Sequence, residues 1–211
     1  MARGRAPGFE SQREEILDAA ARLFAHQGYA GTSMNAVAQA CQVSKPTLYH
    51  YVKDKQELLA QICETHVQGL VALVEEVSAQ GLPPEAHLRV LIARFVQSYG
   101  AAQNQHRVLT EDVKFLGKAE QERLLNIERR VVDAFAQAVA AVRPSLQTDK
   151  LHKPLTMLLF GMINWTFTWL KPDGDLSYDD MAPMVADLFF GGLGAVNAAS
   201  GDAGPAKKTV V

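Results

Sequence analysis

Apolar residues recur at helical spacing along most of this chain, and that pattern limits what the chain can fold into. In the first predicted helix, Ile16, Leu17, Ala20, Leu23 and Phe24 fall on one face at a period of 3.6 residues. The sequence contains no sustained strand-like alternation and no Asn-Gly hairpin turn. No repeat of 20–50 residues is visible either. The sequence therefore predicts an all-α fold of about nine helices.

Capping and breaking residues divide the chain into three short helices and a set of longer ones. Gly28 ends the first helix, Thr32 or Ser33 caps the second, and the third covers residues 45–51 after a turn at residues 41–43. The longer predicted helices cover residues 54–79, 88–99, 107–116, 121–142, 148–170 and 177–197. We predict an arm and DNA-binding domain over residues 1–55, a larger helical domain over 56–198, and a disordered tail over 199–211.

Composition and charge exclude several classes of protein. Hydrophobic residues make up 48% and charged residues 21% of the chain, as in a globular protein with a sizeable core. The net charge of −2 argues against a histone-like polycation. The most apolar stretch, residues 154–170, contains Asn164 and is too short and polar for a membrane span. Without a signal peptide, the sequence predicts a cytoplasmic protein with no membrane partner.

The sequence shows no catalytic or metal-binding motif. It lacks a GxSxG segment, a phosphate-binding P-loop and an HExxH segment, and its six histidines are dispersed. Cys41 and Cys63 have no zinc-ligand spacing, so we read them as buried thiols. We therefore predict no catalytic residues, no metal and no cofactor.

The segment TSMNAVAQACQVSKPTLYHYVKDKQELL, residues 32–59, contains two short helices separated by a tight turn. This arrangement is a helix-turn-helix. Small and apolar side chains pack its helices, and the second helix projects polar ones outward. A helix of this length fits the major groove of DNA, where its N-terminal residues reach base edges. The segment predicts a protein that binds double-stranded DNA.

This segment closely resembles the head of the TetR family of bacterial repressors, over about residues 12–60. The residues that match its patterns are Ala20, Leu23, Phe24, Gly28, Tyr29, Thr32, Ser33, Val43, Ser44, Thr47, Leu48, Tyr49, Tyr51, Val52 and Lys55. The resemblance implies a three-helix DNA-binding head and a larger C-terminal bundle for ligand binding and dimerisation. It also implies a homodimer on a palindromic operator, released by a small-molecule effector.

The resemblance also assigns roles to residues of the head. Phosphate contacts are implied for Thr32, Ser33, Tyr49 and Lys53. Base contacts are implied for Ser44, Lys45, Pro46, Thr47 and His50. Arg3 and Arg5 are candidates for an adjacent minor groove, whereas we assign Tyr51 to packing.

Residues 158–181 resemble a variant found in TetR-type regulators that respond to acyl-CoA thioesters. The matching residues are Gly161, Met162, Asn164, Trp165, Trp169, Leu170, Pro172, Gly174, Leu176 and Ser177. Asn164 is an amide in an apolar helix and needs a polar partner, while two tryptophans at i and i+4 can wall an acyl tunnel. The predicted ligand-binding residues are Arg94, Phe95, Tyr99, Phe160, Asn164, Trp165 and Trp169. The alternatives are core packing of the tryptophans, a different hydrophobic ligand such as a drug or metabolite, and an enzyme acting on CoA esters.

Overall fold

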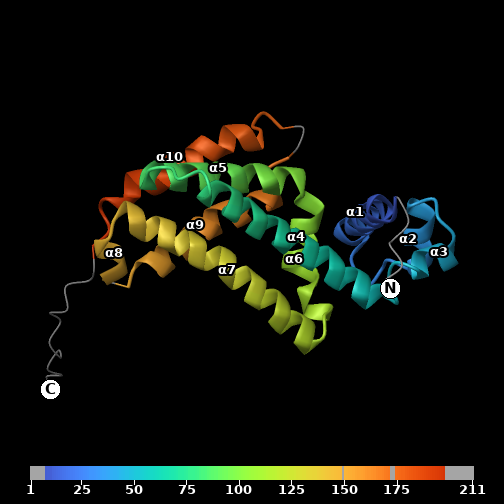
Figure 1. Ribbon diagram of the computed structural model, residues 1–211. Helices are drawn as coiled ribbons and strands as arrows, with labels where there is room; N and C mark the ends of the chain where they lie inside the picture. The colour runs from blue at the N-terminus through green and yellow to red at the C-terminus, as the bar shows by residue number, and fades with distance from the viewer. Residues whose placement is uncertain (1–7, 149, 172–173, 198–211) are drawn as a thin grey trace, which may run out of the picture.

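The computed structural model describes residues 8–148, 150–171 and 174–197, and these residues contain helices and no strands (Figure 1). The helices are α1 (Phe9–Gln27), α2 (Met34–Ala40), α3 (Lys45–Tyr49), α4 (Lys55–Ser78), α5 (Pro84–Ala101), α6 (Gln103–Asp112), α7 (Lys118–Val142), α8 (Ser145–Thr148), α9 (His152–Asn164) and α10 (Tyr178–Leu193). Two 3₁₀ turns, η1 (Val113–Phe115) and η2 (Thr166–Thr168), follow α6 and α9. The predicted all-α fold is confirmed. The predicted tail over residues 199–211 lies outside the described residues.

Helices α1–α3 form a head in which short-range capping fixes each helix start. The Ser33 hydroxyl accepts a hydrogen bond from the Ala36 N–H, and the Ser44 hydroxyl accepts one from the Thr47 N–H. These serines satisfy N–H groups that a helix start otherwise leaves unpaired. Val37 and Leu48 are fully buried and hold α2 and α3 against α1. The helix-turn-helix thus forms where the sequence predicts it.

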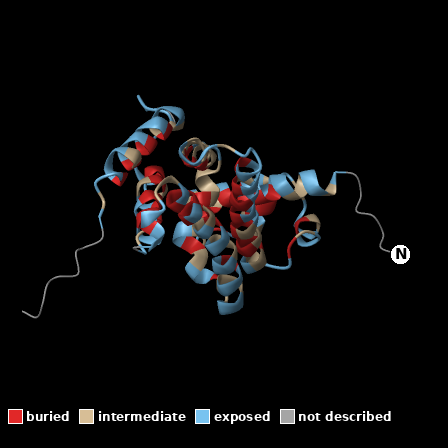
Figure 2. Ribbon diagram, turned by 60° about the vertical axis from the view of Figure 1, so that its left-hand side comes forward, coloured by how far each residue is buried: buried red, intermediate tan, exposed pale blue. Residues whose placement is uncertain are grey.

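Helix α4 joins the head to the body formed by α5–α10 (Figure 1). Asp54 caps it by accepting a hydrogen bond from the Glu57 N–H at 2.8 Å. One apolar core contains head residues, the first half of α4, Val108 of α6 and Leu124 of α7. A second core fills the body around the other half of α4. Buried residues lie mainly on the inward faces of the helices (Figure 2). The predicted boundary after residue 55 therefore lies inside the first turn of α4, and one core spans it.

Residues 148–170 do not form the single helix that the sequence predicts. Helix α9 ends at Asn164 and is followed by η2. The Thr166 hydroxyl donates to the Ile163 carbonyl and the Thr168 hydroxyl to the Trp165 carbonyl, both at 2.7 Å. Such local bonds compete with helical ones and explain the break. Within the described residues, no helix is long and apolar enough to cross a membrane.

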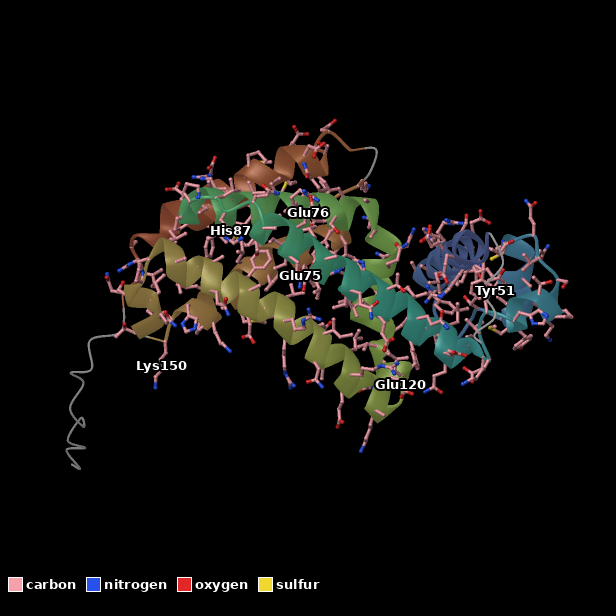
Figure 3. All side chains as sticks on the ribbon, viewed as in Figure 1. Tyr51, Glu75, Glu76, His87, Glu120 and Lys150 are labelled. Carbon is pink, nitrogen blue, oxygen red and sulfur yellow. The ribbon has the colours of Figure 1, made fainter. Side chains whose placement is uncertain are left out.

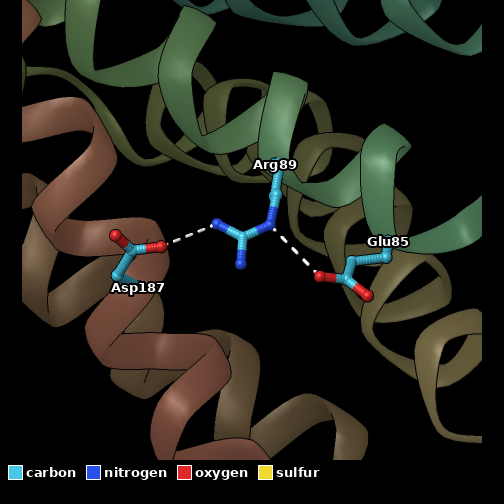
Figure 4. A network of polar contacts seen from close by, with 3 residues as sticks. All are labelled: Glu85, Arg89 and Asp187. Atoms are coloured by element: carbon cyan, nitrogen blue, oxygen red, sulfur yellow. Dashed lines mark hydrogen bonds and ion pairs between the residues drawn. The ribbon is translucent and has the colours of Figure 1, made fainter.

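Helix α10 lies along α5 on one side of the body. Arg89 of α5 bridges Glu85 and Asp187, with distances of 3.2 and 2.8 Å (Figure 4). Gly100 lies directly against the ring of Tyr178, where an added Cβ would come within 2.7 Å of the ring. A small residue at the end of α5 therefore lets α10 start close to it.

Candidate functional site

Helix α3 presents polar side chains at the end of the molecule opposite α8 (Figure 1). Lys45, Pro46 and His50 are exposed, and so is Tyr49. The hydroxyls of Ser44 and Thr47 lie 2.6 Å apart at the start of the helix. Because Leu48 anchors the inner face in the core, these outer residues are held on a fixed surface. This arrangement suits a helix that enters the major groove.

The structure corrects the predicted role of Thr32. Its side chain is only 2% exposed, and its hydroxyl donates to the carbonyls of Gly28 at 3.0 Å and Leu23 at 3.3 Å. A hydroxyl committed to two carbonyls in the core cannot contact DNA phosphate. The adjacent Ser33 is exposed while it caps α2, and Lys53 is exposed beyond α3. Arg3 and Arg5 lie outside the described residues.

Lys55 has a structural role that the sequence did not reveal. Its ammonium donates to the carbonyls of Tyr29 at 2.8 Å and Thr32 at 2.9 Å, and it lies 4.4 Å from the centre of the Tyr29 ring. Tyr29 also stacks on Phe115 of η1, with ring centres 5.0 Å apart. Lys55 therefore connects the loop before α2 to the start of α4.

A cavity of about 240 Å³ lies among α4, α5, α6, α7 and α9. Valine, leucine, methionine and phenylalanine side chains supply most of its wall. Tyr99, His106, Thr110, Glu128 and Asn164 supply its polar groups. Predicted residues Tyr99, Phe160 and Asn164 thus come together here, and Phe95 is buried 6.2 Å from the Phe160 ring.

His106 is the polar residue that sequence reasoning missed. It is only 3% exposed, stacks on Tyr99 with ring centres 4.0 Å apart, and lies 5.8 Å from the His66 ring. Burial lowers the pKa of His106 to about 4, against a smaller opposing effect of the Asn164 backbone carbonyl. Burial also raises the pKa of Glu128. The cavity therefore combines a neutral imidazole with a carboxyl group that is easier to protonate than usual.

Comparison with known proteins identifies the family. Residues 16–62 match the bacterial regulatory proteins of the tetR family, and residues 81–193 match the tetracyclin repressor-like C-terminal domain. The chain belongs to the TetR family. This is a family of DNA-binding regulators, which argues against the alternative of a CoA-ester enzyme.

Several relatives share this TetR architecture along most of their length. A TetR-family regulator from Bordetella parapertussis 12822 is 32% identical, with a TM-score of 0.81, and the match covers 90% of this chain and all of that one. The transcriptional repressor KstR2 of Rhodococcus jostii (strain RHA1) is 25% identical over 190 residues, covering 88% of this chain and 93% of KstR2. The structure of AibR with isovaleryl coenzyme A and operator DNA has a TM-score of 0.72 and 23% identity, covering 84% of this chain and 97% of AibR. That last likeness is one of fold.

In this TetR-family chain, three of the predicted ligand residues lie outside the lining of the cavity. Trp165 is 66% exposed and Trp169 is 49% exposed, and neither is among the described residues that line the cavity. Arg94 is not among those lining residues either, and its guanidinium makes two hydrogen bonds to Glu76 at 3.0 and 2.9 Å (Glu76 is labelled in Figure 3). The prediction that these three residues surround one ligand with Tyr99 is therefore corrected.

Proposed function

We propose that this chain is a ligand-responsive repressor that binds a palindromic operator in double-stranded DNA as a homodimer. The exposed, capped α3 carries this proposal, with Ser44, Lys45, Pro46, Thr47 and His50 facing bases. Ser33, Tyr49 and Lys53 are the proposed phosphate contacts. As a regulator of bacterial DNA, the protein would act in the cytoplasm.

An exposed apolar stripe on α9 and α10 supports the homodimer. Leu158 of α9 is exposed, as are Trp165 directly after α9 and Met184 and Leu188 of α10, with Leu188 at 71%. Gly161 lies on α9 between Leu158 and Trp165 and is itself exposed, which permits close helix approach. In the proposed two-fold dimer through this stripe, the two heads would bind successive major-groove faces, which lie about 34–36 Å apart in DNA.

Analytical ultracentrifugation of a double variant tests the dimer. Leu158→Glu with Leu188→Glu places a carboxylate in each half of the stripe and should yield monomers, because a buried unpaired charge is strongly unfavourable. Leu125→Glu on α7 is the matched control, since Leu125 is 48% exposed but lies on another helix. A double variant that remains dimeric at the same concentrations as the control would refute this interface.

The proposed effector is an acyl-CoA thioester, with its acyl group in the cavity. The mainly apolar wall, the amide of Asn164 and the fold shared with AibR support this assignment. For the phosphates of CoA we assign Lys153 in place of Arg94. Lys153 lies one helical turn before Met157, which lines the cavity, and its ammonium would exchange Asp133, 2.9 Å away, for a phosphate.

A cationic drug or metabolite is the second candidate effector. Glu128 is a partly buried carboxyl group in the cavity lining, and it lies near the aromatic rings of Tyr99 and Phe160. A carboxylate together with aromatic rings suits a cation. If the purified protein retains an acyl-CoA and no amine, a cationic effector is wrong.

Fluorescence anisotropy on an operator selected from a random duplex library tests the whole proposal. Lys45→Gln should weaken specific binding by about 5- to 150-fold, since a good base contact contributes about 1–3 kcal/mol. The matched control is Lys150→Gln, because Lys150 lies at the opposite end of the molecule from the head (Figure 3). Isovaleryl-CoA should release the wild-type protein from the operator. Equal affinity of both variants would refute the recognition helix, whereas no release by any thioester would refute only the effector.

A further inference from the structure

Two of the residues that line the cavity, His106 and Asn164, have buried polar side-chain atoms, and these atoms restrict the chemistry of the ligand. We propose that the effector carries a short acyl group with a hydroxyl at its buried end, which pairs with both His106 and Asn164. This inference rests on the proposed role of the cavity as the effector site. It adds the size and polarity of the group that enters it.

The His106 ring is fixed in place before any ligand arrives. It stacks on Tyr99 and contacts the edge of Phe167, with ring centres 4.0 and 5.3 Å away. The Asn164 backbone carbonyl lies close enough to raise the pKa of His106, but among the described residues neither ring nitrogen makes a hydrogen bond of good geometry. Since the pKa is about 4, the imidazole is neutral at pH 7 and offers one N–H donor and one acceptor nitrogen. A ligand oxygen can therefore accept from this ring without a charge being buried.

Asn164 supplies the complementary group. It is the last residue of α9, and its side-chain oxygen Oδ1 is buried with no partner in the described part of the chain. An unpaired buried acceptor is costly, so it favours a ligand that brings a donor. A hydroxyl both donates to Asn164 Oδ1 and accepts from His106, whereas a ketone satisfies only the histidine and a methyl satisfies neither.

The volume of the cavity sets the length of the acyl group. At about 30 Å³ for a water-sized group, about 240 Å³ accommodates roughly eight non-hydrogen atoms. A methylene group has a similar size, so an acyl chain of four to six carbons with its hydroxyl fills the space. We expect a palmitoyl chain to exceed this volume. A saturated chain of the right length fits, but it leaves His106 and Asn164 unpaired.

Isothermal titration of the full-length wild-type protein with matched thioesters tests this selectivity. We expect 4-hydroxybutyryl-CoA, whose hydroxyl is at the end of the acyl chain, to bind at least tenfold more tightly than butyryl-CoA, and palmitoyl-CoA to bind weakly or not at all. Free 4-hydroxybutyrate against butyrate forms a second arm. If only the free acids bind, with the same preference for the hydroxylated one, the hydroxyl-binding site is supported and a thioester effector is wrong.

Two variants connect the preference to the named residues. His106→Phe keeps an aromatic ring against Tyr99 but removes both nitrogens, and Asn164→Leu removes the amide at similar volume. Either should abolish the tenfold preference. An unchanged helical content in circular dichroism would show that each variant is folded. Equal binding of the hydroxylated and saturated forms to wild type would overturn the inference. If the hydroxylated and the saturated thioester both release the operator, the proposed function is still supported. If no thioester or acid binds, the inference and the proposed effector site are both wrong.

Discussion

The contact between Lys55 and the loop before α2 yields a prediction that separates stability from DNA binding. Lys55→Met keeps the length and the apolar stem of the side chain but removes its ammonium. Two hydrogen bonds of 2.8 and 2.9 Å are lost, and the carbonyls of Tyr29 and Thr32 lose a charged donor. Lys53→Met is the matched control, because Lys53 is exposed two residues earlier in the chain.

The expected loss follows from the partial burial of Lys55. A hydrogen bond to a charged group contributes about 1.5–3 kcal/mol. Lys55 is partly exposed, so water can replace part of both bonds, and the Tyr29 carbonyl still accepts from the Thr32 N–H at 3.3 Å. We therefore expect Lys55→Met to lower the free energy of unfolding by about 2–3 kcal/mol in total, or Tm by about 5–10 °C.

Urea unfolding and operator binding at equal protomer concentration measure the two effects together. Lys53→Met should change unfolding by less than about 0.5 kcal/mol. It should also reduce the slope of log Kobs against log salt by about 0.9 for each head on the DNA. Lys55→Met should do the opposite: it should clearly lower the free energy of unfolding and leave the salt slope almost unchanged. If both variants unfold at the same urea concentration as wild type, the assigned role of Lys55 is wrong.

Three further outcomes follow from buried or crowded groups in the body. Burial lowers the pKa values of His66 and His106 to about 4, and for His66 the neighbouring His106 adds to this effect. The unfolded chain therefore binds more protons than the folded one between about pH 6.5 and 4. Stability should fall as pH drops through this window, by on the order of 3 kcal/mol per histidine. A His66→Gln, His106→Gln variant measured by urea unfolding should lose most of that slope. Gly100→Ala should lower stability by about 1–3 kcal/mol, because its methyl group meets the Tyr178 ring, and Tyr178→Ala should reverse the sign of that change in a double-mutant cycle. Arg143 donates to the carbonyls of residues 193, 194 and 196, so Arg143→Ala should speed amide hydrogen exchange at the end of α10, whereas unchanged exchange would refute this capping role.

The head could be predicted from the sequence because its determinants are local. Ser33 and Ser44 cap helices within three residues of themselves, and Pro46 lies in the first turn of α3. The sequence could not decide which side chains of the head turn inward. Thr32 and Ser33 are neighbours with similar hydroxyls, yet only Thr32 is buried. That difference depends on the path of the loop from Gly28, which is a property of the folded chain.

The body shows a second limit of prediction from the sequence, because helical spacing identifies the apolar face of a helix without showing what covers that face. Consecutive residues of an α-helix differ in direction by about 100°, so the Asn164 that faces the cavity turns Trp165 away from it. The break after Asn164 then brings Thr166 and Phe167 inward and leaves Trp169 outside. Trp165 thereby joins the exposed stripe of Leu158, and the same short segment serves a proposed dimer face on one side and the cavity on the other. Selectivity for the ligand consequently depends on His106, which lies more than fifty residues earlier on α6, and only tertiary packing brings it to Asn164.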